Sequence, residues 1–219
     1  MVTIYFCRLK KRIPPDIIRA LQKEVPKTVR QRILRYKRWQ NRQALLVGRL
    51  ILKKELMQKG FDEDCLDNIS QDNYGRPSIG QSVDFNISYS FPYIVCVVCD
   101  KARVGIDIEK ITEIQARNFR NYMAPIEWDM VLAAENKNVA LLHLWTRKEA
   151  VCKADGRGLS IPLESINVAK NEVFIDRCQW NLKKINISRN SICHLAYNKT
   201  IQEFRISEVN PAQILKSTY

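Results

Sequence analysis

The pattern of apolar and polar positions in the first sixty residues predicts one strand followed by helices. Residues 2–9 are a run of β-branched and aromatic side chains, which favours a strand. Pro14 and Pro15 end that run, and residues 16–24 then have helical spacing. Apolar residues continue to recur every three or four positions over residues 26–60. Because about 33 residues is long for one globular helix, we expect a break near residues 39–41.

The middle of the chain changes to strand patterns. Residues 85–90, 94–99 and 102–109 are short runs rich in β-branched and aromatic residues, and turn residues separate them. We therefore expect three consecutive strands. In the third of them, Asp107 and Glu109 share one face, because successive side chains of a strand point to opposite sides.

The second half predicts helices and then strands again. Residues 111–130 and 132–153 have helical patterns, with Pro125 marking a break or a new start. Short alternating runs with Asn and Lys turns follow residues 161–162. These runs predict an antiparallel meander over residues 165–169, 173–175, 180–187, 191–197 and 202–209. The order of elements predicts an α+β fold in which two similar halves meet near residue 103.

The positive charge of the chain is concentrated at its start. The net charge is +13, and residues 1–60 carry 17 Lys and Arg against three acidic residues. The remaining 159 residues carry 19 basic against 20 acidic residues. The first segment therefore predicts an anionic partner. Within it, Arg42 and Arg49 fall among apolar helix positions, which suggests that they point inward toward an anion.

Cysteine usage and hydropathy bear on the compartment. Seven cysteines are scattered without the regular spacing of a secreted disulfide framework. Cys96 and Cys99 lie in an apolar run, where buried thiols are expected rather than zinc or redox chemistry. No apolar run reaches 18 residues, and the start of the chain lacks the pattern of a secretory signal. We expect a cytoplasmic protein that is not bound to a membrane.

One helix face and one strand face together suggest a metal and phosphate site. Trp145, Glu149 and Lys153 recur every four positions, so they share one face of a helix. The carboxylates of Asp107 and Glu109, joined by Glu149, offer the hard oxygen ligands that Mg²⁺ prefers when it also holds phosphate. Lys153 would stand beside the same phosphate as a point charge.

At these residues the chain resembles a known family. GIDIEK (residues 105–110) and W-T-x-K-E-A-x-x-K-x-x-G-x-G-L (residues 145–159) are similar to the paired signature of the 4′-phosphopantetheinyl transferases of the surfactin-synthetase-activating type. NYGRP at residues 73–77 and FNISYS at residues 85–90 match two further family segments. The resemblance covers residues 26–165 well. It implies transfer of 4′-phosphopantetheine from coenzyme A to a serine of an apo carrier protein, which leaves 3′,5′-ADP.

The resemblance also implies an architecture. The family is a pseudodimer of two similar α+β halves, each with a small antiparallel sheet and packed helices, and its active site lies between the halves. For this chain we expect residues 1–103 to form the coenzyme A side. Residues 104–219 would then carry the metal-binding and catalytic motifs.

Roles follow from the same resemblance. Asp107, Glu109 and Glu149 would be ligands of Mg²⁺ or Mn²⁺, with coenzyme A as co-substrate. Lys153 would neutralise charge on the bridging or leaving oxygen. Either Glu149 or a water on the metal that it orients would deprotonate the serine, and the sequence leaves that choice open.

Further residues are assigned to the coenzyme. The family has a serine and usually a histidine near the nucleotide phosphates, but Tyr89 stands in place of the histidine. A tyrosine donates one hydrogen bond and carries no positive charge, so its contribution to binding the 3′-phosphate is in question. The full set expected to contact coenzyme A is Arg30, Arg42, Arg76, Ser88, Tyr89, Lys148 and Lys153.

The expected partner is an acyl or peptidyl carrier protein of fatty acid, polyketide or nonribosomal peptide synthesis, and the sequence does not select among these. Such carriers are typically acidic, so the apolar and basic surface near Gly158, Leu159 and the first helices is the expected dock. We expect a monomer that does not bind nucleic acid.

Two alternatives are open. One is a nucleic-acid-binding protein, suggested by the basic segment with Tyr36 and Trp39, which leaves the acidic triad unexplained. The other is an inactive relative that holds a carrier without modifying it, for which only Tyr89 argues.

Overall fold

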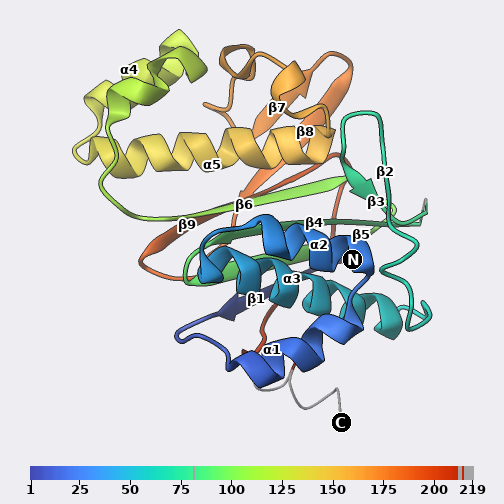
Figure 1. Cartoon of the computed structure of the whole chain (residues 1–219). Helices are drawn as coiled ribbons and strands as arrows, with labels where there is room; N and C mark the ends of the chain where they lie inside the picture. Colours follow the sequence, from blue (N-terminus) through green and yellow to red (C-terminus); the bar gives the residue numbers. More distant parts are fainter. Residues whose placement is uncertain (81, 212–213, 215–219) are drawn as a thin grey trace.

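The computed structural model describes residues 1–80, 82–211 and 214, apart from the side chain of Leu159. The described residues form two four-stranded sheets that lie side by side. Figure 1 shows α3 (Trp39–Gln58) across one of them and α5 (Lys137–Asp155) across the other. A small hairpin of β2 (Ser70–Gln71) and β3 (Pro77–Ser78) stands apart. This arrangement confirms the predicted α+β fold.

The first sheet has the strand order β10-β1-β5-β4. Strands β4 (Val83–Ser90) and β5 (Tyr93–Asp100) form an antiparallel hairpin, and β1 (Val2–Arg8) pairs antiparallel with β5. Strand β10 (Phe204–Glu208) then pairs with β1 in parallel. The end of the chain therefore completes the sheet that its beginning starts, which the predicted antiparallel meander did not include.

The second sheet has the order β6-β9-β8-β7 and is antiparallel throughout. Its strands are β6 (Val104–Lys110), β7 (Glu172–Ile175), β8 (Cys178–Lys184) and β9 (Ser191–Tyr197). The residues 165–169, expected as a strand, instead follow a short 3₁₀ turn, η4 (Leu163–Ser165). Residue 103 separates the sheets except for β10, so the division into halves of 1–103 and 104–219 is crossed by one strand.

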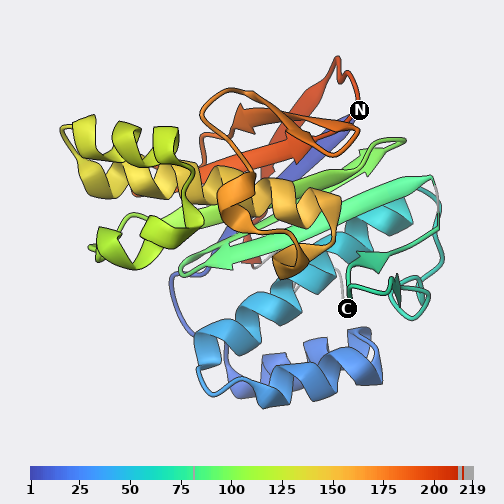
Figure 2. The same ribbon diagram turned by 90° about the horizontal axis from the view of Figure 1, so that it is seen from above.

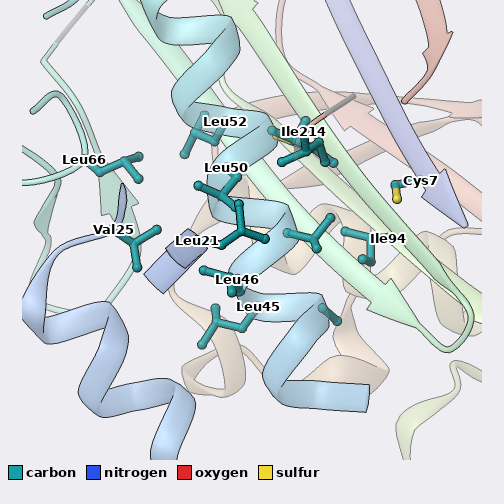
Figure 3. Close-up of a cluster of buried hydrophobic side chains, with 14 of the residues drawn as sticks. Cys7, Leu21, Val25, Leu45, Leu46, Leu50, Leu52, Leu66, Ile94 and Ile214 are labelled. Atoms are coloured by element: carbon teal, nitrogen blue, oxygen red, sulfur yellow. The ribbon is translucent and has the colours of Figure 1, made fainter. Parts of the chain in front are cut away.

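The N-terminal region has several helical elements, of which α3 packs on the first sheet and α2 (Lys27–Arg35) packs on α3. They are α1 (Pro15–Leu21), the 3₁₀ turn η1 (Gln22–Glu24), α2 (Lys27–Arg35) and α3 (Trp39–Gln58). The predicted break falls at residues 36–38, just before the expected position. Figure 3 shows Leu45, Leu46, Leu50 and Leu52 of α3 among the buried side chains of this core, with Ile94 of β5 nearby. Apolar burial of this kind is the main stabilising contribution to the fold.

The helical region of the second half is more broken than the sequence predicted. It consists of η2 (Ala116–Tyr122), α4 (Pro125–Ala133), α5 (Lys137–Asp155) and η3 (Gly158–Ser160). Pro125 begins α4, since proline suits the first turn of a helix, where no amide donor is needed. The expected new start at Pro125 is confirmed, but residues 111–115 are not helical, so a helix beginning at residue 111 was a wrong prediction. No helix within the described ranges is long and apolar enough to cross a membrane.

Helix α5 crosses β6, as the view from above in Figure 2 shows, and the two elements are in contact. A Cβ atom at Gly105 would lie 2.2 Å from the carbonyl oxygen of Ala150 and 2.3 Å from the amide nitrogen of Ala154. Only glycine permits this contact between helix and strand backbones. The GIDIEK motif thus fixes how close α5 comes to the acidic strand.

The two sheets are joined along the edge strands β4 and β6 by side chains of β4. Every second residue of β4 accepts a hydrogen bond from a backbone amide of β6. This satisfies donors that the edge of a buried sheet would otherwise leave unpaired. The acceptors are Asp84, Asn86, Ser88 and Ser90, and the donors are the amides of Val104, Ile106, Ile108 and Lys110, at 2.7, 3.1, 3.4 and 3.0 Å respectively. We call this set the β4 side-chain ladder.

Candidate functional site

The two acidic residues of β6 meet two polar residues of α5 beside the β4 side-chain ladder. The ammonium nitrogen of Lys153 lies 2.5 Å from Oδ1 of Asp107 and 3.0 Å from the hydroxyl of Ser88. Burial alone would lower the pKa of Lys153, but the negative charges of Asp107 and two nearby glutamates outweigh it and raise that pKa. Lys153 is therefore held as a cation.

Three carboxylates share this one neighbouring cation. Burial raises the pKa of Glu109 first, and the charges of Asp107 and Glu149 raise it further against opposition from Ser90 and Lys153. Burial also raises the pKa of Glu149, with Lys153 opposing and Asp107 adding to the effect. The excess of negative charge is the electrostatic condition under which a divalent cation binds.

The site has the oxygen donors that Mg²⁺ prefers, but the described carboxylates are not grouped closely as the ligands of one metal ion. Among the described residues no three His, Cys, Asp or Glu side chains are grouped closely enough to hold a metal ion. Oδ2 of Asp107 is nevertheless buried and has no hydrogen-bond partner in the described chain, which is costly for a carboxylate oxygen. The residues fit Mg²⁺ by donor chemistry, and the assignment of Asp107, Glu109 and Glu149 as its ligands stays a prediction.

Two serines of β4 hold the two acidic residues of β6. The hydroxyl of Ser88 donates to Oδ1 of Asp107 at 2.9 Å, and the hydroxyl of Ser90 donates to Oε2 of Glu109 at 2.8 Å. Ser88 is buried, and its hydroxyl also accepts a hydrogen bond from the ammonium of Lys153. The structure shows Ser88 in contact with Asp107, and its contact with coenzyme A stays a prediction.

Arg76 was expected to bind coenzyme A, but the structure places its guanidinium between the two halves. The guanidinium donates to both carboxylate oxygens of Asp84 at 2.8 and 2.7 Å, to the carbonyl of Val104 at 3.1 Å and to that of Lys153 at 3.0 Å. The turn before it is fixed by Asp72, whose Oδ1 accepts from the amide of Arg76 at 2.9 Å. The structure thus shows the guanidinium of Arg76 bonded within the protein, and its contact with coenzyme A stays a prediction.

Lys148 was also expected near coenzyme A and is instead fully buried. Its ammonium forms an ion pair with Glu127 at 2.7 Å and donates to the carbonyls of Leu163 and Ile166. Burial lowers the pKa of Lys148, and Glu127 opposes that shift. Adjacent helix residues point about 100° apart, so Lys148 cannot follow Glu149 into the site. Its role here is structural.

Arg30 and Arg42 each donate a hydrogen bond to a backbone carbonyl. Nη1 of Arg30 donates to the carbonyl of Gln22 at 3.4 Å, and Nε of Arg42 donates to that of Tyr36 at 2.7 Å. Arg42 is exposed, so only the second of the two arginines expected to point inward, Arg49, does so. Neither Arg30 nor Arg42 joins the cavity described next.

A cavity of about 280 Å³ brings together two other arginines, Arg32 of α2 and Arg49 of α3. Nε and Nη1 of Arg49 are buried and have no hydrogen-bond partner in the described part of the chain. Burial lowers the pKa of Arg49 first, and the charge of Arg32 lowers it further. A buried cation with unused donors beside a second cation is suited to an anion. We call this site the arginine cavity; it is lined by Thr28, Val29, Arg32, Leu45, Arg49, Leu66, Ile69, Gln71 and Pro77.

Sequence patterns only partly indicated this cavity. Arg49 was noticeable because it interrupts an apolar helix face, whereas Arg32 is one of many basic residues of α2. Arg32 lies four positions after Thr28, which also lines the cavity. This helical spacing, which puts the two side chains on one face, was the available signal in the sequence.

Tyr89 lies near Arg32 of the arginine cavity. Burial raises the pKa of Tyr89 to about 12, a hydrogen bond with Tyr36 adds to that effect, and the charge of Arg32 opposes it. The phenol therefore stays neutral at physiological pH. Arg32 supplies next to Tyr89 the positive charge that tyrosine lacks.

Comparisons with known proteins identify relatives of this chain. The family model described as the 4′-phosphopantetheinyl transferase superfamily matches residues 103–199, which contain β6 and α5. The 4′-phosphopantetheinyl transferase gsp of Aneurinibacillus migulanus is 31% identical over 176 residues, which cover 78% of this chain and 73% of that protein. The 4′-phosphopantetheinyl transferase Sfp of Bacillus subtilis is 32% identical over 123 residues, 54% of each chain.

A solved structure is also similar in part. The holo-[acyl-carrier-protein] synthase of Thermotoga maritima aligns with a TM-score of 0.36 and 13% identity over 45% of this chain and 64% of that one. The family model and the extent of identity to the Aneurinibacillus protein settle the relationship without it. This chain belongs to the 4′-phosphopantetheinyl transferase family.

Proposed function

We propose that this protein transfers 4′-phosphopantetheine from coenzyme A to a serine of an apo acyl or peptidyl carrier protein. The observation that carries the proposal is the meeting of Asp107, Glu109, Glu149 and Lys153 where β6 and α5 cross. Three carboxylates around one ammonium suit a diphosphate held through a divalent cation. Membership of the family supports the reaction class.

Coenzyme A would be bound at two anionic points. We assign its 3′-phosphate to the arginine cavity, because the donors of Arg49 are unused there and Arg32 adds a second charge. Lys153 would meet the diphosphate. The 3′-phosphate is thus assigned to Arg32 and Arg49, and the expected contacts of Arg30, Arg42 and Arg76 with coenzyme A stay predictions.

A bound Mg²⁺, or Mn²⁺ in its place, would be held by Asp107, Glu109 and Glu149, would neutralise the diphosphate and would act as a Lewis acid on it. Ser88 and Ser90 hold the first two carboxylates by hydrogen bonds from the neighbouring strand. A carboxylate fixed in this way loses little freedom when a cation binds, which favours binding.

The transfer itself exchanges one phosphorus–oxygen bond for another. The hydroxyl oxygen of the carrier serine bonds to the phosphorus of the phosphopantetheine group, and the bond from that phosphorus to the oxygen of 3′,5′-ADP breaks. Lys153 stabilises the charge that develops on the leaving oxygen. The serine proton passes to Glu149 or to a water that Glu149 orients.

We place the protein in the cytoplasm as a monomer. All seven cysteines are free in the described chain, and six of them are buried, which suits a reducing compartment. The biosynthetic pathway of the carrier is open between fatty acid, polyketide and nonribosomal peptide synthesis.

Intact-mass spectrometry tests the proposal directly. An apo acyl carrier protein and an apo peptidyl carrier protein are each incubated with this protein, coenzyme A and Mg²⁺. We expect a gain of about 340 Da, one phosphopantetheine, on at least one carrier, and its loss when EDTA is present. No gain on either carrier would contradict the proposal, and calorimetry would then tell an inactive coenzyme-binding relative from a protein that does not bind coenzyme A.

A further inference from the structure

A second cavity opens on the outer side of the N-terminal helices. It has a volume of about 210 Å³ and lies between α1, α2 and the start of α3. Its apolar wall includes Ile33, Leu34 and Trp39, and 66% of the surface of Leu34 is exposed to solvent. Large apolar side chains exposed around a hollow mark a contact surface more often than scattered exposed residues do. We call it the helix pocket.

The rim of the helix pocket is basic. Arg12, Arg19 and Arg42 line it and are exposed. Within the described ranges none of the three forms an ion pair with a carboxylate. Their charges are therefore free to meet an acidic partner, which would speed encounter and set orientation.

Contacts lead from the helix pocket to the candidate active site. The ring of Trp39 meets that of Phe91 edge to face, with centroids 5.6 Å apart. Phe91 follows Ser90, whose hydroxyl holds Glu109 at 2.8 Å. A partner bound in the helix pocket would thus lie near the part of the site that contains Glu109.

Another exposed apolar surface is less suited to an acidic partner. Ile126 and Met130 are exposed one turn apart on α4, but the exposed carboxylate of Asp129 stands between them in sequence. An acidic partner would be repelled there. The free arginines favour the helix pocket.

We propose that the helix pocket is the docking site of the carrier protein, which inserts an apolar side chain beside Leu34 and Trp39 while its acidic residues meet Arg12 and Arg19. This inference rests on the proposed function. The occupant is an acidic, amphipathic helical surface near the reactive serine. The surface near Gly158 and Leu159 expected from the sequence is not needed for it, and the side chain of Leu159 lies outside the described part of the structure.

Steady-state kinetics with an apo carrier test the docking site. The variants are Leu34→Glu and the double variant Arg12→Glu, Arg19→Glu. All three positions are exposed, so folding should be retained, and circular dichroism checks it. We expect at least a tenfold rise in KM for the carrier, with less than a twofold change in the Kd for coenzyme A.

Matched controls change exposed residues elsewhere: Leu132→Glu on α4, and the double variant Arg177→Glu, Arg189→Glu. The controls should keep the wild-type KM for the carrier. The docking site would be overturned if all variants kept the wild-type KM for the carrier, or if the controls raised that KM as much as the docking variants do. Transfer by the wild type would uphold the proposed function in either case. The docking site would also be overturned by a second outcome. In that outcome the wild type binds anionic vesicles, Leu34→Glu abolishes this binding, and the KM for the carrier does not change.

Discussion

Arg49 shows how one side chain can carry both a cost and a function. Its guanidinium is buried in the arginine cavity with two nitrogens unpaired in the described chain. An unpaired buried charge destabilises a fold unless a ligand supplies the missing partner. The residue is better explained by an anion that binds than by the stability of the protein alone.

Replacing Arg49 should therefore separate binding from stability. We expect Arg49→Met to raise the Kd for coenzyme A about tenfold or more, since charge-assisted hydrogen bonds contribute about 1.5–3 kcal/mol. The free energy of unfolding should stay level or rise. Calorimetry with coenzyme A and with 3′-dephospho-coenzyme A checks the assignment, because the loss should vanish with the second ligand. Arg30→Met is the control, and equal effects in both variants would refute the cavity assignment.

His194 gives a pH dependence of stability at the same scale. Burial lowers the pKa of His194 to about 3, and the neighbouring His143 adds to the effect. The unfolded chain, with an ordinary histidine pKa near 6.5, takes up the proton first as pH falls. The stability contribution is complete above about pH 6.5 and is lost on the way down to about pH 3.

We expect this group to reduce the free energy of unfolding by about 2 kcal/mol between pH 7 and pH 5. Urea titrations at both values, on the wild type and on His194→Gln, measure it. The variant should show the smaller difference between the two pH values. A variant as pH-sensitive as the wild type would exclude His194 as the source.

At the scale of elements, the β4 side-chain ladder does two tasks at once. All four of its members bind the edge of β6, but only Ser88 and Ser90 also donate to a carboxylate of the site through their hydroxyls. Asn86 bonds only to the Ile106 amide in this set. Asn86 therefore serves as the comparison for Ser88 and Ser90, because it joins the sheets without bonding to a carboxylate of the site.

Ser90→Ala should weaken metal binding more than stability explains. Loss of an outer hydrogen bond to a metal ligand typically costs 10–100-fold in affinity. We expect a weakening of that order in Mn²⁺ binding, followed by electron paramagnetic resonance without any turnover. Ser90→Thr should restore the affinity because it restores the hydroxyl. Asn86→Ala should lower stability and keep the affinity, and the reverse pattern would be inconsistent with this role for Ser90.

The elements also explain which parts of the site could be predicted from sequence. Trp145, Glu149 and Lys153 repeat at helical spacing, so the sequence could place them on one helix face, and the structure brings Lys153 of that face to Asp107. Arg76 could not be assigned that way, because its partners Asp84 and the Lys153 carbonyl come from distant segments. Likewise β10 reads as a further strand of a meander, and only tertiary pairing sends it to β1.

At the scale of the whole molecule, the two sheets depend on a few shared contacts. Arg76 ties the β2–β3 hairpin to β4, β6 and α5 through Asp84 and two carbonyls. Its side chain is 7% exposed. Removing one member of a buried ion pair leaves the other charge without compensation.

Arg76→Met should cost about 3–5 kcal/mol of unfolding free energy. Denaturant unfolding followed by tryptophan fluorescence and by circular dichroism measures the loss. We expect the two signals to stay coincident if the halves unfold together. Arg30→Met should be nearly neutral. An Arg76 variant as stable as the wild type would show that the guanidinium is dispensable to the junction.

The parallel pairing of β10 with β1 has a consequence for synthesis on the ribosome. Strand β1 is made long before its parallel partner, and one of its edges is paired only when residues 204–208 leave the exit tunnel. Until then that edge presents free amides and carbonyls to any extended chain nearby. Strand β1 therefore keeps one unpaired edge while all the residues between the two strands are made, so the nascent chain is exposed to wrong pairing throughout that time.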